Sequence, residues 1–123
     1  MNDSRIGNIS TAAANFAWSS AEKKVARAAF DMALGREFQA VMKKTKESAA
    51  KIEQPSDMWD LEAYLTRCRK RIDREFDYRY SVLLEVFAGL IVRGRLREYE
   101  LHGLGGEKIE CIQRYVGFAR RDD

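Results

Sequence analysis

The sequence contains a single proline, eight glycines and one histidine among its 123 residues. So little proline and glycine argues against a turn-rich β-sandwich, and the abundance of Ala, Leu, Glu, Lys and Arg favours an all-α fold. One histidine, His102, and two distant cysteines, Cys68 and Cys111, cannot supply a conventional His/Cys zinc site. A Ser-His-Asp or Cys-His arrangement would have to include His102, for which the sequence offers no evident partner. The composition therefore argues against an enzyme and against a metal protein.

The sequence also lacks a strong excess of one charge and a long apolar run. Its 22 Lys and Arg residues against 19 Asp and Glu give a formal charge of +3, well short of a dedicated nucleic-acid binder. The longest apolar run, residues 82–92, is interrupted by Glu85 and is much shorter than the roughly 20 residues that span a bilayer. No basic segment followed by an apolar core begins the chain, and two separated cysteines fit a reducing compartment. We expect a cytoplasmic protein without a secretory signal or a transmembrane segment.

Two short motifs have both a structural and a functional interpretation. Gly103–Gly106 precedes Lys108 as glycines do in phosphate-binding loops, but the Walker spacing and an upstream strand are missing, which favours a turn between helices. Four basic side chains are predicted to share the outer arc of one helix: Arg67, Lys70, Arg71 and Arg74. Such arcs are usually solvated, and nucleic-acid binding through this one would depend steeply on salt.

The spacing of apolar residues predicts a tail, a helical hairpin and a helical head. Residues 1–17 are small and polar without a period, and we expect them to form a flexible tail. Order should begin at Trp18, which could pack on the first helical turn, because Ser19 and Glu22 have the spacing of a capping box. A helix then continues to Glu53 with a narrow seam at steps of three and four. The seam comprises Phe30, Leu34, Phe38, Val41, Thr45, Ser48 and Ile52.

A break at residues 54–57 separates this helix from a second one. Pro55 interrupts the pattern, and Ser56 or Asp57 is expected to cap the second helix. The second seam comprises Met58, Leu61, Leu65, Cys68, Ile72 and Phe76. Two long helices joined by a short turn predict an antiparallel hairpin over residues 18–77, long enough to pack against further helices.

Residues 78–121 are predicted to form a compact helical head. Residues 81–93 are apolar nearly all round, as expected of a helix at the centre of a packed cluster, and Gly94 should end that helix. A short segment over residues 96–101 and a glycine break follow. A last helix is expected over residues 107–116, with Gly117 ending it.

One flank of the second helix carries side chains that the hairpin does not use. Trp59 points away from the predicted seam, and an exposed tryptophan is a typical anchor of an interface. Glu62, Arg69 and Asp73 share this flank, with Arg69 and Asp73 at ion-pair spacing. The flank is therefore a candidate subunit or partner interface. The alternative is that Trp59 folds over the hairpin turn onto the N-terminal segment.

Several motifs in this order resemble the fluorescence recovery protein family of cyanobacteria. The sequence runs Asp57-Met58-Trp59-Asp60-Leu61, then Tyr64-Leu65, Arg69, Ile72-Asp73, and Asp77-x-Arg79-x-Ser81-Val82-Leu83. The N-terminal Trp18-Ser19-x-Ala21-Glu22 and the later Glu100-Leu101-x-x-Leu104 belong to the same pattern. The resemblance covers about residues 18–112 without a gap.

This resemblance implies a fold and a function. Members of the family are all-helical homodimers with long crossing helices and a compact head. They bind the photoactivated orange carotenoid protein through its C-terminal domain and speed its return to the orange state. They also help to detach it from the phycobilisome, which ends photoprotective non-photochemical quenching, and they use no cofactor. A member of this family is expected in the cytoplasm, peripheral to the cytoplasmic face of the thylakoids.

The resemblance also assigns roles to residues of the second helix. The family's functional Trp and Arg match Trp59 and Arg69, and its apolar dimer-seam position matches Met58. The family's essential aspartate is Ala63 here, and the preceding histidine is Glu62. Loss of a carboxylate that pairs with arginine should weaken a contact by about 1–3 kcal/mol unless Glu62 replaces it.

The head departs from the family pattern at two positions. Glu85 stands where the family has an exposed aromatic side chain, and Cys111 stands where it has a lysine. Both are candidate head contacts to a partner. The dimer scaffold is thus retained while the surface for the carotenoid protein is altered. The alternative is therefore a dimer of the same fold that binds a different, non-carotenoid signalling partner.

Overall fold

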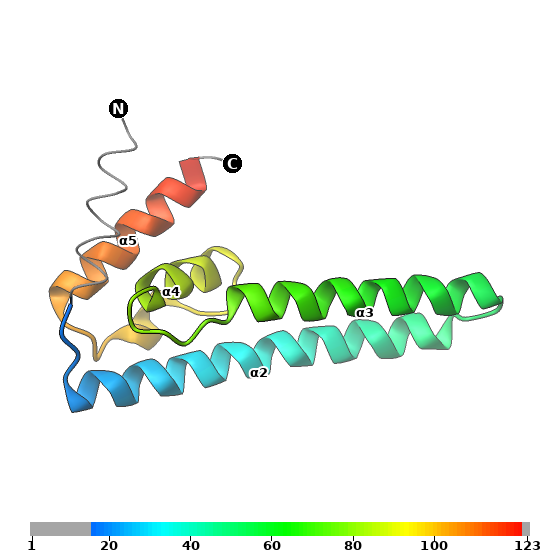
Figure 1. Ribbon diagram of the computed structural model, residues 1–123, viewed down its shortest axis with the longest axis horizontal. Helices are drawn as coiled ribbons and strands as arrows, with labels where there is room; N and C mark the ends of the chain where they lie inside the picture. Colours follow the sequence, from blue (N-terminus) through cyan, green and yellow to red (C-terminus); the bar gives the residue numbers. More distant parts are fainter. Residues whose placement is uncertain (1–15, 122–123) are drawn as a thin grey trace.

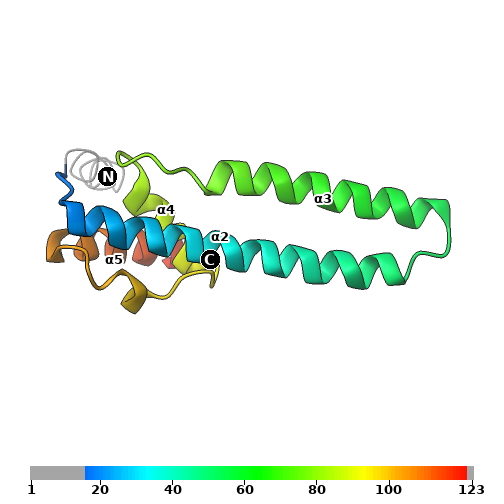
Figure 2. The same cartoon turned by 90° about the horizontal axis from the view of Figure 1, so that it is seen from below.

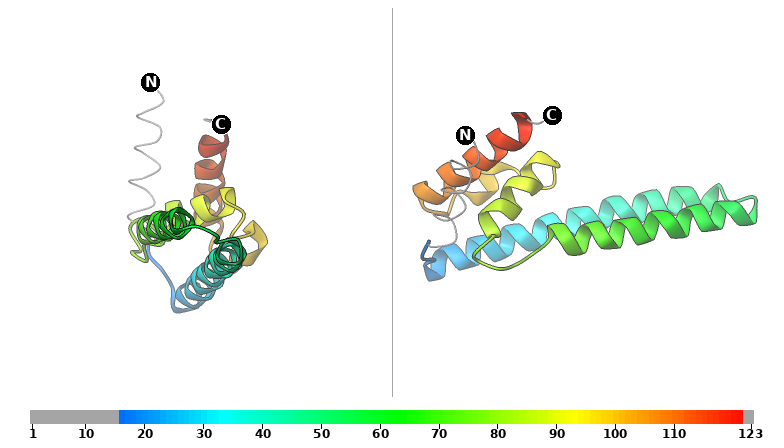
Figure 3. Two further views of the ribbon diagram at one scale, coloured as in Figure 1. Left: turned by 90° about the vertical axis from the view of Figure 1, so that its right-hand side faces the viewer. Right: turned by 45° about the horizontal axis from the view of Figure 1, so that its top comes forward.

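The computed structural model describes residues 16–121, which form four α-helices and one 3-10 turn with no strand among them. The elements are α2 (Ser20–Ala50), α3 (Pro55–Glu75), α4 (Leu83–Val92), η1 (Glu98–Leu101) and α5 (Gly106–Arg121). In Figure 1, α2 and α3 lie side by side along the longest axis and run in opposite directions. α4, η1 and α5 gather at the end where α2 begins, so the turn between α2 and α3 extends away from them (Figures 2 and 3). All-helical architecture, as predicted, is confirmed.

The capping box predicted for the first helix is present. The Glu22 backbone N–H donates to Ser19 Oγ at 3.0 Å, and the Ser19 backbone N–H donates to Glu22 Oε1 at 3.0 Å. The other oxygen of Glu22 accepts from the Gly105 N–H at 2.8 Å and from Lys108 Nζ at 3.0 Å. These hydrogen bonds, those from the Ser19 and Gly105 backbone first, lower the pKa of Glu22 from 4.5 to about 2. The cap therefore also joins the start of α2 to the start of α5.

Lys108 holds the first described residues in place. Its ammonium group donates to the Ala17 carbonyl at 2.7 Å and lies 5.2 Å from the ring centroid of Phe16 and 5.0 Å from that of Trp18. Trp18 packs on Tyr80, with 5.1 Å between ring centroids, and so joins the start of α2 to the head. Most of the expected tail, residues 1–15, lies outside the described residues.

The cap of α3 differs from the prediction. Gln54, not Ser56 or Asp57, is the N-cap residue, and the helix begins at Pro55. Pro55 suits the first helical position because its φ is preset and that position needs no N–H donor. Asp57 instead lies in the first turn, where its Oδ2 accepts from the backbone N–H groups of Glu53 at 3.0 Å and Gln54 at 3.1 Å.

The head packs on small side chains of α2. Ala26, Ala29 and Ala33 are at most 2% exposed, and their size lets the head helices approach the backbone of α2 closely. The head supplies a core of large apolar side chains: Leu83, Leu84, Phe87, Leu90, Leu96, Leu101, Leu104 and Ile112. As predicted, α4 is the most apolar element and lies at the centre of the head (Figure 1).

Two glycine predictions have opposite outcomes. Gly94 does end α4: it has φ of +78°, its N–H donates to the Ile91 carbonyl, and the Arg95 N–H donates to the Leu90 carbonyl at 2.9 Å. This is the Schellman arrangement that glycine favours. Gly117 does not end α5, which continues to Arg121. The helix continues because Phe118 packs against the core, so that packing outweighs the low helix propensity of one glycine.

Candidate functional site

The hairpin leaves part of both predicted seams exposed. On α2, Phe38 of the predicted seam and Met42 beside it are each 46% exposed, and the seam residues Met58 and Leu65 on α3 are 45% and 39% exposed. The only fully buried side chain of α3 is Cys68. The prediction that the hairpin itself buries Phe38, Met58 and Leu65 is therefore wrong. Two helices in contact cover only a narrow stripe of each other, and these side chains lie at its edge.

Four of the exposed apolar side chains lie on one side of the hairpin, whereas Met32 of α2, which is 43% exposed, lies on the other side. On α2, Phe38 and Met42 lie about 100° and 140° around the helix from Glu37, which faces α3. On α3, Leu65 and Met58 lie about 60° and 80° around the helix from buried Cys68, in the same rotational sense. In antiparallel helices, equal rotations from the contact lead to the same side of the pair. We call this set (Phe38, Met42, Met58 and Leu65) the apolar side.

The flank predicted from the sequence adjoins the apolar side. Measured from Cys68, the side chains of Arg69, Glu62, Asp73 and Trp59 lie at about 100°, 120°, 140° and 180°, and all four are exposed. Trp59 is 65% exposed, so the described part of the chain does not cover it. The structure thus places these predicted interface residues on one continuous outward strip of α3.

Ala63, where the family has its aspartate, is half-buried and lies just beyond Trp59 around the helix. Glu62 is held in place by its neighbour, because Thr66 Oγ1 donates to Glu62 Oε2 at 2.8 Å. Glu62 and Arg69 are seven residues apart, about 10 Å along the axis, which is too far for a direct contact within one helix. Within residues 16–121, Arg69 and Asp73 form no ion pair despite their spacing. The charges of Arg69 and Asp73 are therefore available to groups from another chain.

The two candidate head residues lie in different surroundings. Glu85 is exposed on α4 and accepts a hydrogen bond from the Tyr115 hydroxyl at 3.2 Å. Cys111 is only 7% exposed, and its burial raises the pKa of the thiol. In this structure Cys111 is therefore part of the head core, which corrects its assignment as a surface contact: its small apolar side chain packs inward where a lysine would have to reach solvent.

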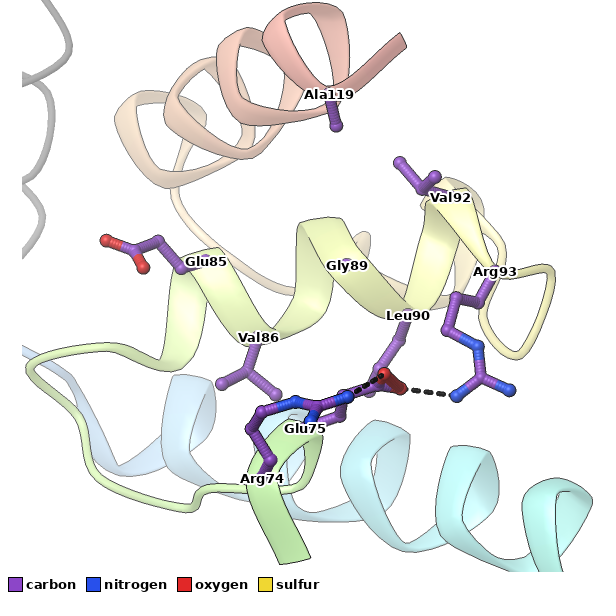
Figure 4. Close-up of a pocket in the computed structure, with 9 residues that line it drawn as sticks. All are labelled: Arg74, Glu75, Glu85, Val86, Gly89, Leu90, Val92, Arg93 and Ala119. Atoms are coloured by element: carbon purple, nitrogen blue, oxygen red, sulfur yellow. Dashed lines mark hydrogen bonds and ion pairs between the residues drawn. The ribbon is translucent and has the colours of Figure 1, made fainter. Parts of the chain in front are cut away.

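A shallow groove lies beside Glu85 where the head meets the end of α3. It has a volume of about 380 Å³, and its lining comes from α3, α4 and α5 (Figure 4). Val86, Gly89 and Leu90 of α4 form its apolar centre, while Arg74 and Glu75 of α3 lie at one end. A Cβ atom built at Gly89 would meet nothing within 4 Å, so the backbone of α4 is open at this point. The groove is thus an apolar surface with charged groups at its rim.

One site was not predicted from the sequence. Glu37 is completely buried, and three guanidinium groups surround it: Arg71 Nη2 at 2.7 Å, Arg93 Nη2 at 3.0 Å and Arg95 Nε at 3.1 Å. Burial by itself would raise the pKa of Glu37, but the hydrogen bond from Arg71 and the charges of the three arginines outweigh it and lower that pKa. The prediction that Arg71 lies on a solvated outer arc is therefore wrong. The available signal was Glu37 itself, a charge four residues beyond Ala33 on the stripe that the head covers.

Neither a metal centre nor a membrane helix is found in the part of the chain that the structure describes. Within residues 16–121, no three His, Cys, Asp or Glu side chains are grouped so that they could hold a metal ion. No helix in the same range has the length and apolar character needed to cross a bilayer.

Comparison with known proteins identifies the family. Residues 18–114 match the family of the photoprotection regulator fluorescence recovery protein. The chain is 36% identical over 96 residues to the fluorescence recovery protein of Synechocystis sp., covering 78% of this chain and 88% of that protein. It is also similar to the solved structure from Fremyella diplosiphon, with 40% identity and a TM-score of 0.79 over 81% of this chain and 98% of the other. The solved structure from Synechocystis sp. PCC 6803 gives the same TM-score and coverage at 34% identity. The chain belongs to the fluorescence recovery protein family.

Proposed function

We propose that this chain is a homodimeric regulator that binds the photoactivated orange carotenoid protein through that protein's C-terminal domain. It accelerates the return of the carotenoid protein to the orange state and so ends non-photochemical quenching at the phycobilisome. Family membership over residues 18–114 is the single observation that carries this proposal. The partner places the activity in the cytoplasm, at the cytoplasmic face of the thylakoids.

The hairpin is the proposed dimerisation stalk. Four large apolar side chains on one side of a two-helix hairpin are an unusual exposure for a monomer, and a second copy of the same side would cover them. In a dimer of this kind with a two-fold axis near Leu65, α3 of one subunit runs antiparallel to α3 of the other. Glu62 of each subunit then lies opposite Arg69 of the other, because the midpoint between them falls at residues 65–66. The arrangement gives Arg69 the carboxylate that Ala63 no longer supplies.

Trp59 and the head supply the proposed partner contacts. Trp59 is 65% exposed beside the proposed dimer seam, where it can anchor either the subunit contact or the carotenoid protein. In the head, Glu85 and the groove around Gly89 form the surface that corresponds to the family's exposed aromatic position. No cofactor is needed for this role. Binding accelerates recovery if the protein binds the transition state of its partner's relaxation more tightly than the photoactivated state. Each difference of about 1.4 kcal/mol between these two binding free energies makes the recovery tenfold faster.

A specific observation supports a second candidate function, in which the same dimer binds a non-carotenoid signalling protein. Ala63 presents a methyl group instead of a carboxylate, and Glu85 presents a charge beside an apolar groove. Both changes alter the surface for the carotenoid protein but leave the apolar side of the hairpin unchanged. The two functions therefore share the dimer and differ in the partner.

The deciding experiment mixes the purified protein with photoconverted orange carotenoid protein and follows recovery of the orange colour. We expect a faster recovery and co-elution of the two proteins. Gly89→Leu should abolish the acceleration by filling the groove, whereas Gly117→Leu, at an exposed glycine of α5 with equally open surroundings, should leave it unchanged. An unchanged rate together with no co-elution for the unaltered protein would refute the proposed partner and favour the second candidate.

A further inference from the structure

The buried carboxylate of Glu37 lies where the hairpin and the head meet. Its Oε2 accepts from Arg71 of α3, and its Oε1 contacts Arg93 and Arg95, which follow α4. One carboxylate thus joins α2 to residues that lie 34 to 58 positions further along the chain. The nearby Arg36 supports the same junction from α2, since it donates to the Arg95 carbonyl at 3.1 Å and to both oxygens of Glu100 at 2.7 Å.

The positive charges of this cluster are largely offset only while Glu37 is ionised. The side chains of Arg71, Arg93 and Arg95 are 30%, 27% and 26% exposed, so water screens them only partly. Glu75 offers a second carboxylate through its ion pair with Arg93, which gives three positive and two negative charges in all. Loss of the Glu37 charge would leave three partly buried guanidinium groups with one carboxylate. Removing one charged group from a buried cluster strongly destabilises the fold, because the remaining charges are left buried without a partner.

The contacts of Glu37 join α2 to two different parts of the molecule. The bond to Arg71 joins α2 to α3 within the hairpin, whereas the bonds to Arg93 and Arg95 join α2 to the head. Arg93 and Glu75 also line the groove beside α4, as Figure 4 shows, so the cluster holds one end of that groove in place. Apolar packing between two curved surfaces tolerates sliding, but charge-assisted bonds of fixed geometry do not.

We propose that Glu37 is a positioning residue that locks the head at one orientation on the hairpin and thereby fixes the shape of the groove between α3 and α4. The lock itself is independent of the proposed partner. Its consequence for binding rests on the proposed function.

A distance measurement tests the lock. Spin labels at Lys46→Cys on α2 and Arg114→Cys on α5, both exposed positions, report the head-to-hairpin distance, and the native Cys68 and Cys111 are buried from the label. Dilution of labelled chains with unlabelled protein restricts the signal to one subunit. We expect one narrow distance distribution for the unaltered protein and at least a doubling of its width in Glu37→Gln. Glu47→Gln, a matched change at an exposed position of α2, should keep the narrow distribution.

A second variant keeps the test decisive if Glu37→Gln fails to fold. Arg95→Gln removes one head contact but leaves Arg71 on Glu37, and it should broaden the distribution while the hairpin remains dimeric. A narrow distribution in either folded variant would overturn the proposal, because apolar packing alone would then position the head. The acceleration of colour recovery should also fall at least tenfold in Arg95→Gln. If the unaltered protein shows no acceleration, the proposed partner fails while the distance result still decides the lock.

Discussion

The charge pair proposed across the dimer axis can be tested by exchanging its charges. Glu62→Arg places an arginine opposite Arg69 in both halves of the interface, and Arg69→Glu places two carboxylates opposite each other. Each single change should therefore weaken the dimer. The double variant, Glu62→Arg with Arg69→Glu, restores opposite charges with the order reversed and should recover dimerisation.

The expected loss of dimer stability follows from the two-fold symmetry of the proposed interface. A hydrogen bond to a charged group contributes about 1.5–3 kcal/mol, and a two-fold interface contains each contact twice. A single reversal should therefore cost at least about 3 kcal/mol, which raises the dimer dissociation constant by roughly 150-fold. The double variant should return to within about tenfold of the unaltered protein. High salt should reduce these differences, because both side chains are exposed in the single chain.

Sedimentation equilibrium over a wide concentration range measures these constants directly. Lys43→Glu, an exposed charge reversal on the opposite side of α2, is the matched control and should leave the dimer unchanged. If both single variants dimerise as well as the unaltered protein, or if the double variant is weaker than either, Glu62 and Arg69 do not face each other and the proposed axis is wrong.

Three further outcomes follow from the structure. Glu22, with a pKa of about 2 against an ordinary 4.5, contributes stability that is complete above pH 4.5 and is lost as the pH falls towards 2. Glu22→Gln should therefore cost on the order of 3 kcal/mol at pH 7 and flatten this pH dependence in acid unfolding; an unchanged acid midpoint would contradict it. Gly103→Ala places a Cβ atom 2.3 Å from Val25 Cγ2 and should lower stability by about 1–3 kcal/mol in urea unfolding. Gly35→Ala meets nothing within 4 Å and should instead raise stability by about 0.5–1 kcal/mol; a loss at this position would contradict the open surroundings.

Local signals in the sequence predicted some helix ends but not others. The capping box of Ser19 and Glu22 and the glycine that ends α4 depend on residues within one turn, so their spacing alone indicates them. The end of α5 was mispredicted at Gly117 because the decisive contact, that of Phe118 with the core, comes from tertiary structure. Local patterns predict where a helix can end, whereas packing decides whether it does.

The Glu37 cluster could not be predicted because its partners are distant in sequence. Arg71, Arg93 and Arg95 lie 34 to 58 residues from Glu37, and each is an ordinary basic residue in its own helix or loop. On the helical wheel Arg71 lies only about 60° from the buried Cys68, so grouping it with the solvated side chains was wrong, and its long guanidinium side chain reaches Glu37 from there. The same limit applies to Cys111, whose burial depends on how α5 packs against α4.

The candidate surface was predicted in position but not in extent. A helical wheel identifies the strip of Trp59, Glu62, Arg69 and Asp73, since their angles depend only on sequence numbers. The apolar side needed the structure, because a seam read from sequence does not indicate whether a helix of the same chain or of another covers it. Leu65 shows the difference: it belongs to the predicted seam, yet it is 39% exposed.

The molecular mass in solution tests the central claim most directly, because the proposed dimer covers the apolar side of the hairpin with a second chain. Light scattering at micromolar concentration should give twice the 14.2 kDa of one chain, and Leu65→Glu should reduce this to a single chain with unchanged helix content. A mass of 14.2 kDa for the unaltered protein even at high concentration would contradict the account.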